Sequence, residues 1–427
     1  MKYNLKKLKN GINVITTSIK GTKAITILVL FPVGSRYEDK KLAGASHFVE
    51  HLMFKGTQKR PTTLDISRQL EAVGAEYNAF TSKDYTGYYV KIASAKQELA
   101  YDLLSDMIFN SKLEEEEIER EKGVIIEELR MYEDNPTMAV DQLFEQTIFG
   151  DHPLGRDIGG TIDSVRAMTR KQLFNYYKKY YSPANMVVVL SGDVPKGKAL
   201  KKCLSFFEQY SGTSGKNLVS NFKKYTWSKN SGIDKRVGVK KRKLDQAHVI
   251  LGFPALAIQD KDKYIAAVLT NILGSGMKSR LFVEVRERRG LAYMVRAGMD
   301  SNRDVGTFQI QAGLNPARLK EAIKVIREQL ELMKNELVSS KELSEAKGNL
   351  IGSMSLSSED SSVMANLYAK QFWFSKEIKE PNKIYIEIKQ VTKQEIQRVA
   401  KRIFIREKMN IAVIGNITRK QILSMLK

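Results

Sequence analysis

Apolar residues in this chain gather in short runs rich in β-branched side chains, a pattern typical of buried strands. The longest run, residues 24–32, is far too short to span a bilayer and predicts a strand inside a core. Residues 10–17 also predict a strand. Residues 113–132 mix glutamates with apolar positions over about five and a half turns and predict a long acidic helix.

The order of predicted elements occurs twice, with strands first, then helices, then strands again. Three pairs of segments repeat at nearly constant offsets: 26–32 with 248–254 (248 − 26 = 222), 118–123 with 343–348 (343 − 118 = 225), and 186–194 with 409–417 (409 − 186 = 223). The repeat predicts an α+β fold of two homologous domains. Each domain is expected to be a mainly antiparallel sheet covered by helices.

A chain of 427 residues is long enough for two or more domains. Stretches rich in Ser and Gly at 211–217 and 228–232 are typical of a flexible connection. We therefore predict one domain over 1–210, a linker over 211–234 and a second domain over 235–427.

Two of the four histidines, His47 and His51, lie four positions apart with Glu50 between them. Residues i and i+4 share one face of a helix, so both imidazoles can reach one metal ion. This H-x-x-E-H pattern is the inverzincin signature, in which the glutamate takes a proton from a metal-activated water. The alternative is an ordinary pair of histidines on a helix.

A catalytic zinc needs a third protein ligand, and the acidic helix offers candidates. Glu121 and Glu128 are seven positions apart, so they point the same way. Glu128 follows the apolar residues 124–126, and a buried carboxylate there must be paired or bound to metal. The glutamates at 114–117 are expected to form a solvated face.

The segment 47–128 resembles the pitrilysin/insulysin superfamily of zinc peptidases, especially the catalytic β-subunit of mitochondrial processing peptidase and its bacterial relatives. Glu128 lies 77 positions after His51 (128 − 51), where that family carries its third ligand. The resemblance implies that His47, His51 and Glu128 bind one zinc ion. It also implies that Glu50 is the general base and that Glu121 supports the site.

The second half lacks this set of residues. Ala267, Thr270 and Asn271 fall opposite His47, Glu50 and His51, and Ser353 falls opposite Glu128. One copy of the repeat therefore carries the predicted chemistry, and the other keeps only the scaffold.

The resemblance also implies roles for residues outside the predicted metal site. Arg286 and Tyr293 match a pair that reaches the family's active site from the second domain, where they would steady the substrate and the oxyanion. Asn78, Ala79 and Phe80 match the strand along which substrate adds by backbone pairing. The alternatives are an ordinary amphipathic helix and an ordinary strand with Asn78 in a turn.

These residues predict a zinc-dependent endopeptidase for short or unfolded polypeptides. The resemblance implies two subunits that enclose a chamber. One chain carries both residue sets, so a homodimer suffices, while a heterodimer with a degenerate subunit is the alternative. The competing function is a non-catalytic peptide-binding or scaffold subunit of the same superfamily.

The net charge of +22 invites a nucleic-acid function, but the lysines are scattered among glutamates and no nucleic-acid-binding motif accompanies them. A basic surface could instead favour acidic peptides. A single cysteine, Cys203, indicates a reducing compartment. No leader or membrane segment is recognisable, so we expect a cytoplasmic protein without membrane contact.

Overall fold

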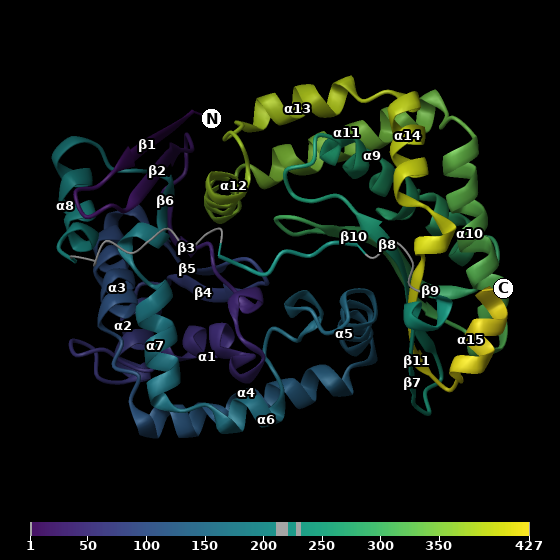
Figure 1. Ribbon diagram of the computed structural model, residues 1–427. Coiled ribbons are helices and arrows are strands. Elements are labelled where there is room, and N and C mark those ends of the chain that lie inside the picture. Colours follow the sequence, from purple (N-terminus) through teal and green to yellow (C-terminus); the bar gives the residue numbers. More distant parts are fainter. Residues whose placement is uncertain (1, 211–220, 228–231, 427) are drawn as a thin grey trace. The chain divides into compact units, whose positions relative to one another are not determined.

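The computed structural model describes residues 2–210, 221–227 and 232–426 (Figure 1). The chain forms two compact units, and each combines most of one half of the sequence with a segment of the other half. The first unit contains Met1–Leu129, Asp157–Lys223 and Ser355–Asn382. The second unit contains Arg130–Arg156, Lys224–Met354 and Lys383–Lys427.

These units correct the predicted contiguous domains, 1–210 and 235–427. The units exchange the segments 130–156 and 355–382, because a helix packs on whichever sheet face it fits, regardless of the half that encodes it. Residues 211–220 and 228–231 of the predicted linker lie outside the described residues, and the boundary between the units follows Lys223.

The first unit is built on a six-stranded sheet with the order β1-β2-β6-β3-β5-β4. Only the β2–β6 pair is parallel. The predicted strand at 24–32 is the buried inner strand β3, and β4 forms one edge of the sheet. The strands are β1 (Tyr3–Lys7), β2 (Asn13–Ser18), β3 (Ala24–Phe31), β4 (Glu76–Thr81), β5 (Thr86–Ala93) and β6 (Val187–Gly192).

Helices cover this sheet, and most come from the same half of the chain. They are α1 (Ala45–Leu52), α2 (Thr63–Glu71), α3 (Gln97–Asn110), α4 (Glu115–Asp134), α6 (Ile162–Ala167), α7 (Arg170–Tyr180) and α8 (Gly197–Glu208). The helix α12 (Ser361–Phe374) comes from the other half and lies against β6 and β3 (Figure 1). Thr26 and Ser361 share a buried hydrogen bond of 2.7 Å, which fixes α12 on the sheet.

The second unit repeats this plan with a five-stranded sheet of order β7-β11-β8-β10-β9, in which only β7 and β11 are parallel. Its strands are β7 (Val237–Lys241), β8 (Ala247–Ala255), β9 (Ala292–Ser301), β10 (Gly306–Leu314) and β11 (Asn410–Gly415). Its helices are α9 (Lys263–Gly274), α10 (Leu319–Asn335), α11 (Ser340–Ser357), α13 (Pro381–Gln390), α14 (Lys393–Ile403) and α15 (Arg419–Leu426).

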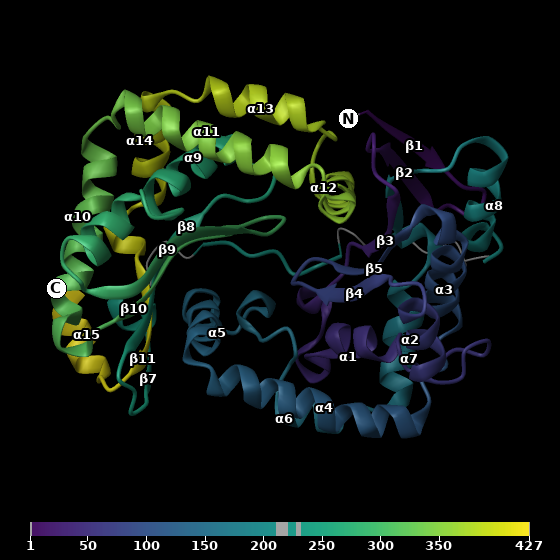
Figure 2. The same cartoon turned by 180° about the vertical axis from the view of Figure 1, so that it is seen from behind.

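The helix α5 (Pro136–Phe149), from the first half of the chain, lies against β11 and β8 of this second sheet (Figure 2). Glycines in the sheet allow this close approach, since a Cβ at Gly252 would collide with the ring of Phe144. The exchanged helices α5 and α12 are counterparts in the repeat, at an offset of 225 (361 − 136). The predicted α+β fold with two homologous, mainly antiparallel sheets is confirmed.

Candidate metal centre

The helix α1 carries the H-x-x-E-H segment, and its start is fixed by a buried carboxylate. Gly44 precedes it with φ of +97°, a conformation that favours glycine. Glu38 accepts the backbone N–H groups of Gly44 and Ser46 at 2.7 and 2.6 Å, so it caps the helix from the preceding loop. Burial raises the pKa of Glu38 to about 7. No local pattern in the sequence marks Glu38 for this role.

Three predicted ligands, His47, His51 and Glu128, meet between α1 and α4. Their candidate ligand atoms lie within 4.8 Å of one another. The Nε2 atoms of His47 and His51 are 3.6 and 3.5 Å from Glu128 Oε2. Two ligands about 2.1 Å from one tetrahedral ion are themselves about 3.4 Å apart. The spacing of this donor set therefore fits a zinc ion.

His51 is bonded to Glu121, the residue that the resemblance gives as a support of the site. Its Nδ1 lies 3.1 Å from Glu121 Oε2, and Lys55 Nζ lies 2.6 Å from the other oxygen of Glu121. Burial alone would raise the pKa of Glu121, but the bonds to His51 and Lys55 outweigh it and hold the pKa below its ordinary value. This contact leaves His51 Nε2 facing Glu128, which is the nitrogen that a metal would take.

The pKa values of the two imidazoles are shifted in opposite directions. Burial lowers the pKa of His47 to about 4, so this ring is neutral and offers a lone pair. Burial also disfavours a charge on His51, but hydrogen bonds to Glu121 and Glu128 outweigh it and raise the pKa to about 9. A metal ion would thus replace the proton that His51 shares with these carboxylates.

Glu50 lies beside the ligand set. Burial raises the pKa of its carboxyl group, and a hydrogen bond from Thr81 partly offsets this rise. Thr81 Oγ1 donates that bond to Glu50 Oε2 at 2.5 Å. A carboxylate held in this way, next to two imidazoles that could bind metal, can serve as a proton acceptor. The link between Thr81 and Glu50 was not foreseen from the sequence.

Comparison with known proteins agrees with this arrangement. Residues 13–162 match the family model for insulinase (peptidase family M16), and residues 167–350 match the model described as the peptidase M16 inactive domain. An uncharacterized zinc protease of Streptomyces coelicolor is 37% identical over 414 residues, which cover 97% of this chain and 90% of that protein. The chain belongs to the insulinase family, M16.

Further proteins resemble the chain in sequence or in fold. The uncharacterized zinc protease YmxG of Bacillus subtilis is 32% identical, with 93% of this chain and 94% of YmxG covered. The crystal structure of a protease from Helicobacter pylori has a TM-score of 0.88 at 26% identity and covers 97% of this chain and 99% of its own. A complex III structure from Candida albicans shares the fold, with a TM-score of 0.83 at 14% identity and coverage of 99% of both chains.

The strand β4, which contains Asn78, Ala79 and Phe80, lies at one edge of the sheet of the first unit. This strand pairs with β5 on one side, and no described strand pairs with its other side. The Phe80 ring lies over Gly87 of β5, where a Cβ would collide with it. Asn78 is in the strand, so the alternative of a turn at this residue is wrong. An open edge of this kind can pair with an extended peptide.

Arg286 and Tyr293 belong to the second unit and lie next to each other. Arg286 is in a π-helical segment (Phe282–Glu287), and Tyr293 is near the start of β9. The Arg286 guanidinium lies 5.1 Å from the centre of the Tyr293 ring, and Tyr293 is 75% exposed. The pair is therefore available to a ligand, and its part in the reaction stays a prediction.

The second unit has no equivalent of the ligand set in the described parts of the chain. Asn271, the counterpart of His51, donates a hydrogen bond to Asn349 of α11 at 2.8 Å. In the second unit, neutral amides join α9 to α11. In the first unit, imidazoles and carboxylates join α1 to α4.

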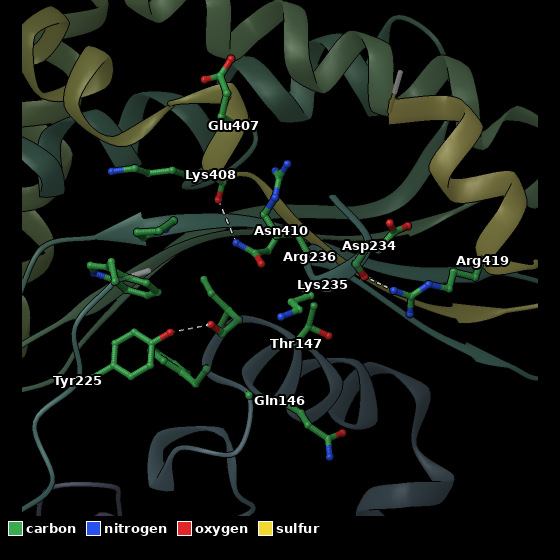
Figure 3. A pocket seen from close by; sticks show the side chains of 15 residues that line it. Gln146, Thr147, Tyr225, Asp234, Lys235, Arg236, Glu407, Lys408, Asn410 and Arg419 are labelled. Carbon is green, nitrogen blue, oxygen red and sulfur yellow. Dashed lines mark hydrogen bonds between the residues drawn. The ribbon is translucent and has the colours of Figure 1, made fainter. Parts of the chain in front are cut away.

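A separate cavity of about 570 Å³ lies in the second unit (Figure 3). Phe149, Tyr225 and Trp227 line one side, with stacked rings of Phe149 and Trp227 5.6 Å apart. The Tyr225 hydroxyl donates a hydrogen bond to the carbonyl of Ile148 at 3.2 Å. These contacts fasten the segment around Tyr225 to the end of α5, and none of the predicted site residues lines the cavity.

No helix in the described ranges is long and apolar enough to cross a membrane.

Proposed function

We propose that this M16 protein is a zinc-dependent endopeptidase that hydrolyses peptide bonds in short or unfolded polypeptides, with one zinc ion per chain. The observation that carries the proposal is the convergence of His47, His51 and Glu128 at the spacing of a tetrahedral site, with Glu50 beside them. The zinc protease names of the relatives support the same reading.

Each residue of the site has a defined task in this proposal. His47, His51 and Glu128 would hold the ion, and Glu121 would keep the His51 ring in place through Nδ1. Bound zinc supplies Lewis acidity, which polarises a carbonyl group and makes water more acidic. Glu50 accepts the proton of the attacking water and returns it to the leaving amine.

Substrate is held by backbone groups in the proposed reaction. An extended peptide pairs with the open edge of β4 along Asn78, Ala79 and Phe80, which selects for chains that are not folded. Arg286 and Tyr293 supply donors that steady the substrate and the oxyanion. Two copies of the chain form the working assembly, which acts in the cytoplasm and binds neither nucleic acid nor membrane.

The test is cleavage of a quenched fluorescent peptide library by the purified full chain. Glu50→Gln keeps the size of the side chain and removes its basicity, so we expect its kcat to fall by about 10²- to 10⁴-fold with zinc retained. Treatment with a chelator should abolish activity, and added zinc should restore it. Glu116→Gln, an exposed position on α4, is the matched control and should equal wild type.

A second candidate is a non-catalytic peptide-binding or scaffold subunit, which the fold shared with a complex III chain favours. A wild-type protein that binds zinc and peptides but cleaves none of the library would establish this function and overturn the peptidase proposal.

A further inference from the structure

We propose that Thr81 is a positioning residue for the Glu50 carboxylate and that it links peptide pairing at the edge of β4 to proton transfer at Glu50. The inference rests on the proposed peptidase function and adds a residue to it. Its basis is the hydrogen bond of 2.5 Å from Thr81 Oγ1 to Glu50 Oε2, which joins the edge strand to the helix α1.

Glu50 depends on this bond for its orientation. A glutamate side chain has several rotatable bonds, so an unrestrained carboxylate samples many positions. In the described parts of the chain, Thr81 is the only side chain that donates a hydrogen bond to Glu50. The nearby phenols of Tyr88 and Tyr181 are bonded to each other at 2.8 Å instead.

Threonine at this position is well suited to hold a carboxylate. Its β-branched side chain is stiff at χ1, and its backbone is fixed where Thr81 pairs with Thr86 of β5. The Ser82 N–H also donates to the Tyr85 carbonyl at 2.8 Å, which closes the turn after β4. One hydroxyl proton engages one carboxylate oxygen, so Glu50 Oε1 stays available to accept a proton.

The same strand offers the open edge for substrate. Thr81 directly follows Phe80, the last residue of the segment expected to pair with a peptide. A peptide strand added to β4 would restrict the motion of its backbone, and Thr81 would pass that restriction to Glu50. Peptides that pair with the whole edge should therefore be turned over faster, and not only bound more tightly.

The experiment compares kcat, KM and zinc content for wild type, Thr81→Val and Thr81→Ser. Valine keeps the branched shape and removes the donor, so we expect kcat to fall by about 10- to 100-fold with KM and zinc content nearly unchanged. Serine keeps the donor and should stay within about threefold of wild type. Thr16→Val, on β2 and without a side-chain hydrogen bond in the described structure, is the matched control.

A peptide series tests the link to β4. A peptide too short to reach Asn78 should show a smaller difference in kcat between wild type and Thr81→Val than a longer one. An equal difference for both peptides would overturn the link.

Other results overturn the positioning role itself. These are an active wild type with Thr81→Val equal to it, a loss confined to KM, or a serine variant as poor as the valine variant. If Thr81→Val does not fold, Thr81→Ala replaces it in the same comparison. An inactive wild type instead rejects the proposed function, and this outcome needs no Thr81 variant.

Discussion

The two copies of the repeat hold equivalent helices together by different chemistry. In the first unit, α1 and α4 meet through His47, His51 and two glutamates, one of which is only 2% exposed. In the second unit, α9 and α11 meet through the amides of Asn271 and Asn349. Both arrangements support the same fold, so the fold does not require charged groups at this junction.

Buried charge is costly unless it is paired, and a neutral amide pair fills the same position at lower cost. The first unit nevertheless keeps three groups that could hold a metal and a buried carboxylate that orients one of them. Only one of the two copies buries charged groups at this junction, although a neutral amide pair costs less free energy. This difference indicates that the first unit keeps its charged groups for a function.

The two units should differ most when a predicted metal ligand is removed from the first one. Glu128→Gln should lower zinc affinity by more than the 10- to 100-fold expected for losing a hydrogen-bond partner of a ligand, because it replaces the charged ligand oxygen by a neutral amide. Metal content after dialysis measures this loss. Glu127→Gln, at the exposed neighbouring position, should keep one zinc per chain. Zinc retained by Glu128→Gln would contradict the assigned ligand set.

A second test concerns the carboxylates that precede α1 and α9. Burial raises the pKa of Glu38 from 4.5 to about 7, so the folded state binds a proton that the unfolded chain releases. Its contribution to stability is full below pH 4.5 and is lost as the pH rises through 7. The free energy of unfolding of wild type relative to Glu38→Gln should fall between pH 5 and 8, by on the order of 3 kcal/mol at most.

Asp262 before α9 should behave in the opposite way. Hydrogen bonds from Arg398 and Arg402 hold its pKa below the ordinary value, so its contribution is lost only when acid protonates it. Urea unfolding at several pH values distinguishes the two cases. A difference between wild type and Glu38→Gln that grows with pH would show that Glu38 is ionised in the folded protein.

The smallest expected effect is in the second unit. Asn271→Ala removes the hydrogen bond to Asn349 and should lower the free energy of unfolding by about 1 kcal/mol. Zinc content and peptide cleavage should not change. Asn349→Ala should cost about the same, and a double-mutant cycle in urea measures their coupling. Loss of zinc in either variant would mean that the two copies are not separate in function.

Much of this structure could be predicted from local patterns of apolar and polar residues. The apolar run at 24–32 became β3, the acidic segment became α4, and the repeat offsets placed equivalent strands in both sheets. The proximity of His47 and His51 could be predicted as well, because residues four positions apart share one face of a helix.

Contacts between distant segments were harder to foresee. Glu38 caps α1, and Thr81 reaches Glu50 across 31 positions, yet each is an ordinary loop or strand residue in the sequence. Their roles depend on where the backbone brings them, and no periodicity marks that. The contact of Lys55 with the Glu121 carboxylate, which also accepts from His51, is of the same kind.

The two-copy α+β plan, the helix with its paired histidines, and the distance along the chain to Glu128 could all be predicted from the amino-acid sequence. These follow from periodicity and spacing, which act over a few residues or repeat along the chain. Two features depended on contacts between distant segments: α5 and α12 pack on the sheet of the other half of the chain, and Glu38 and Thr81 make hydrogen bonds to the start of α1 and to Glu50. Such choices depend on which surfaces fit together once the sheets exist, because packing and buried hydrogen bonds join residues without regard to their order in the chain.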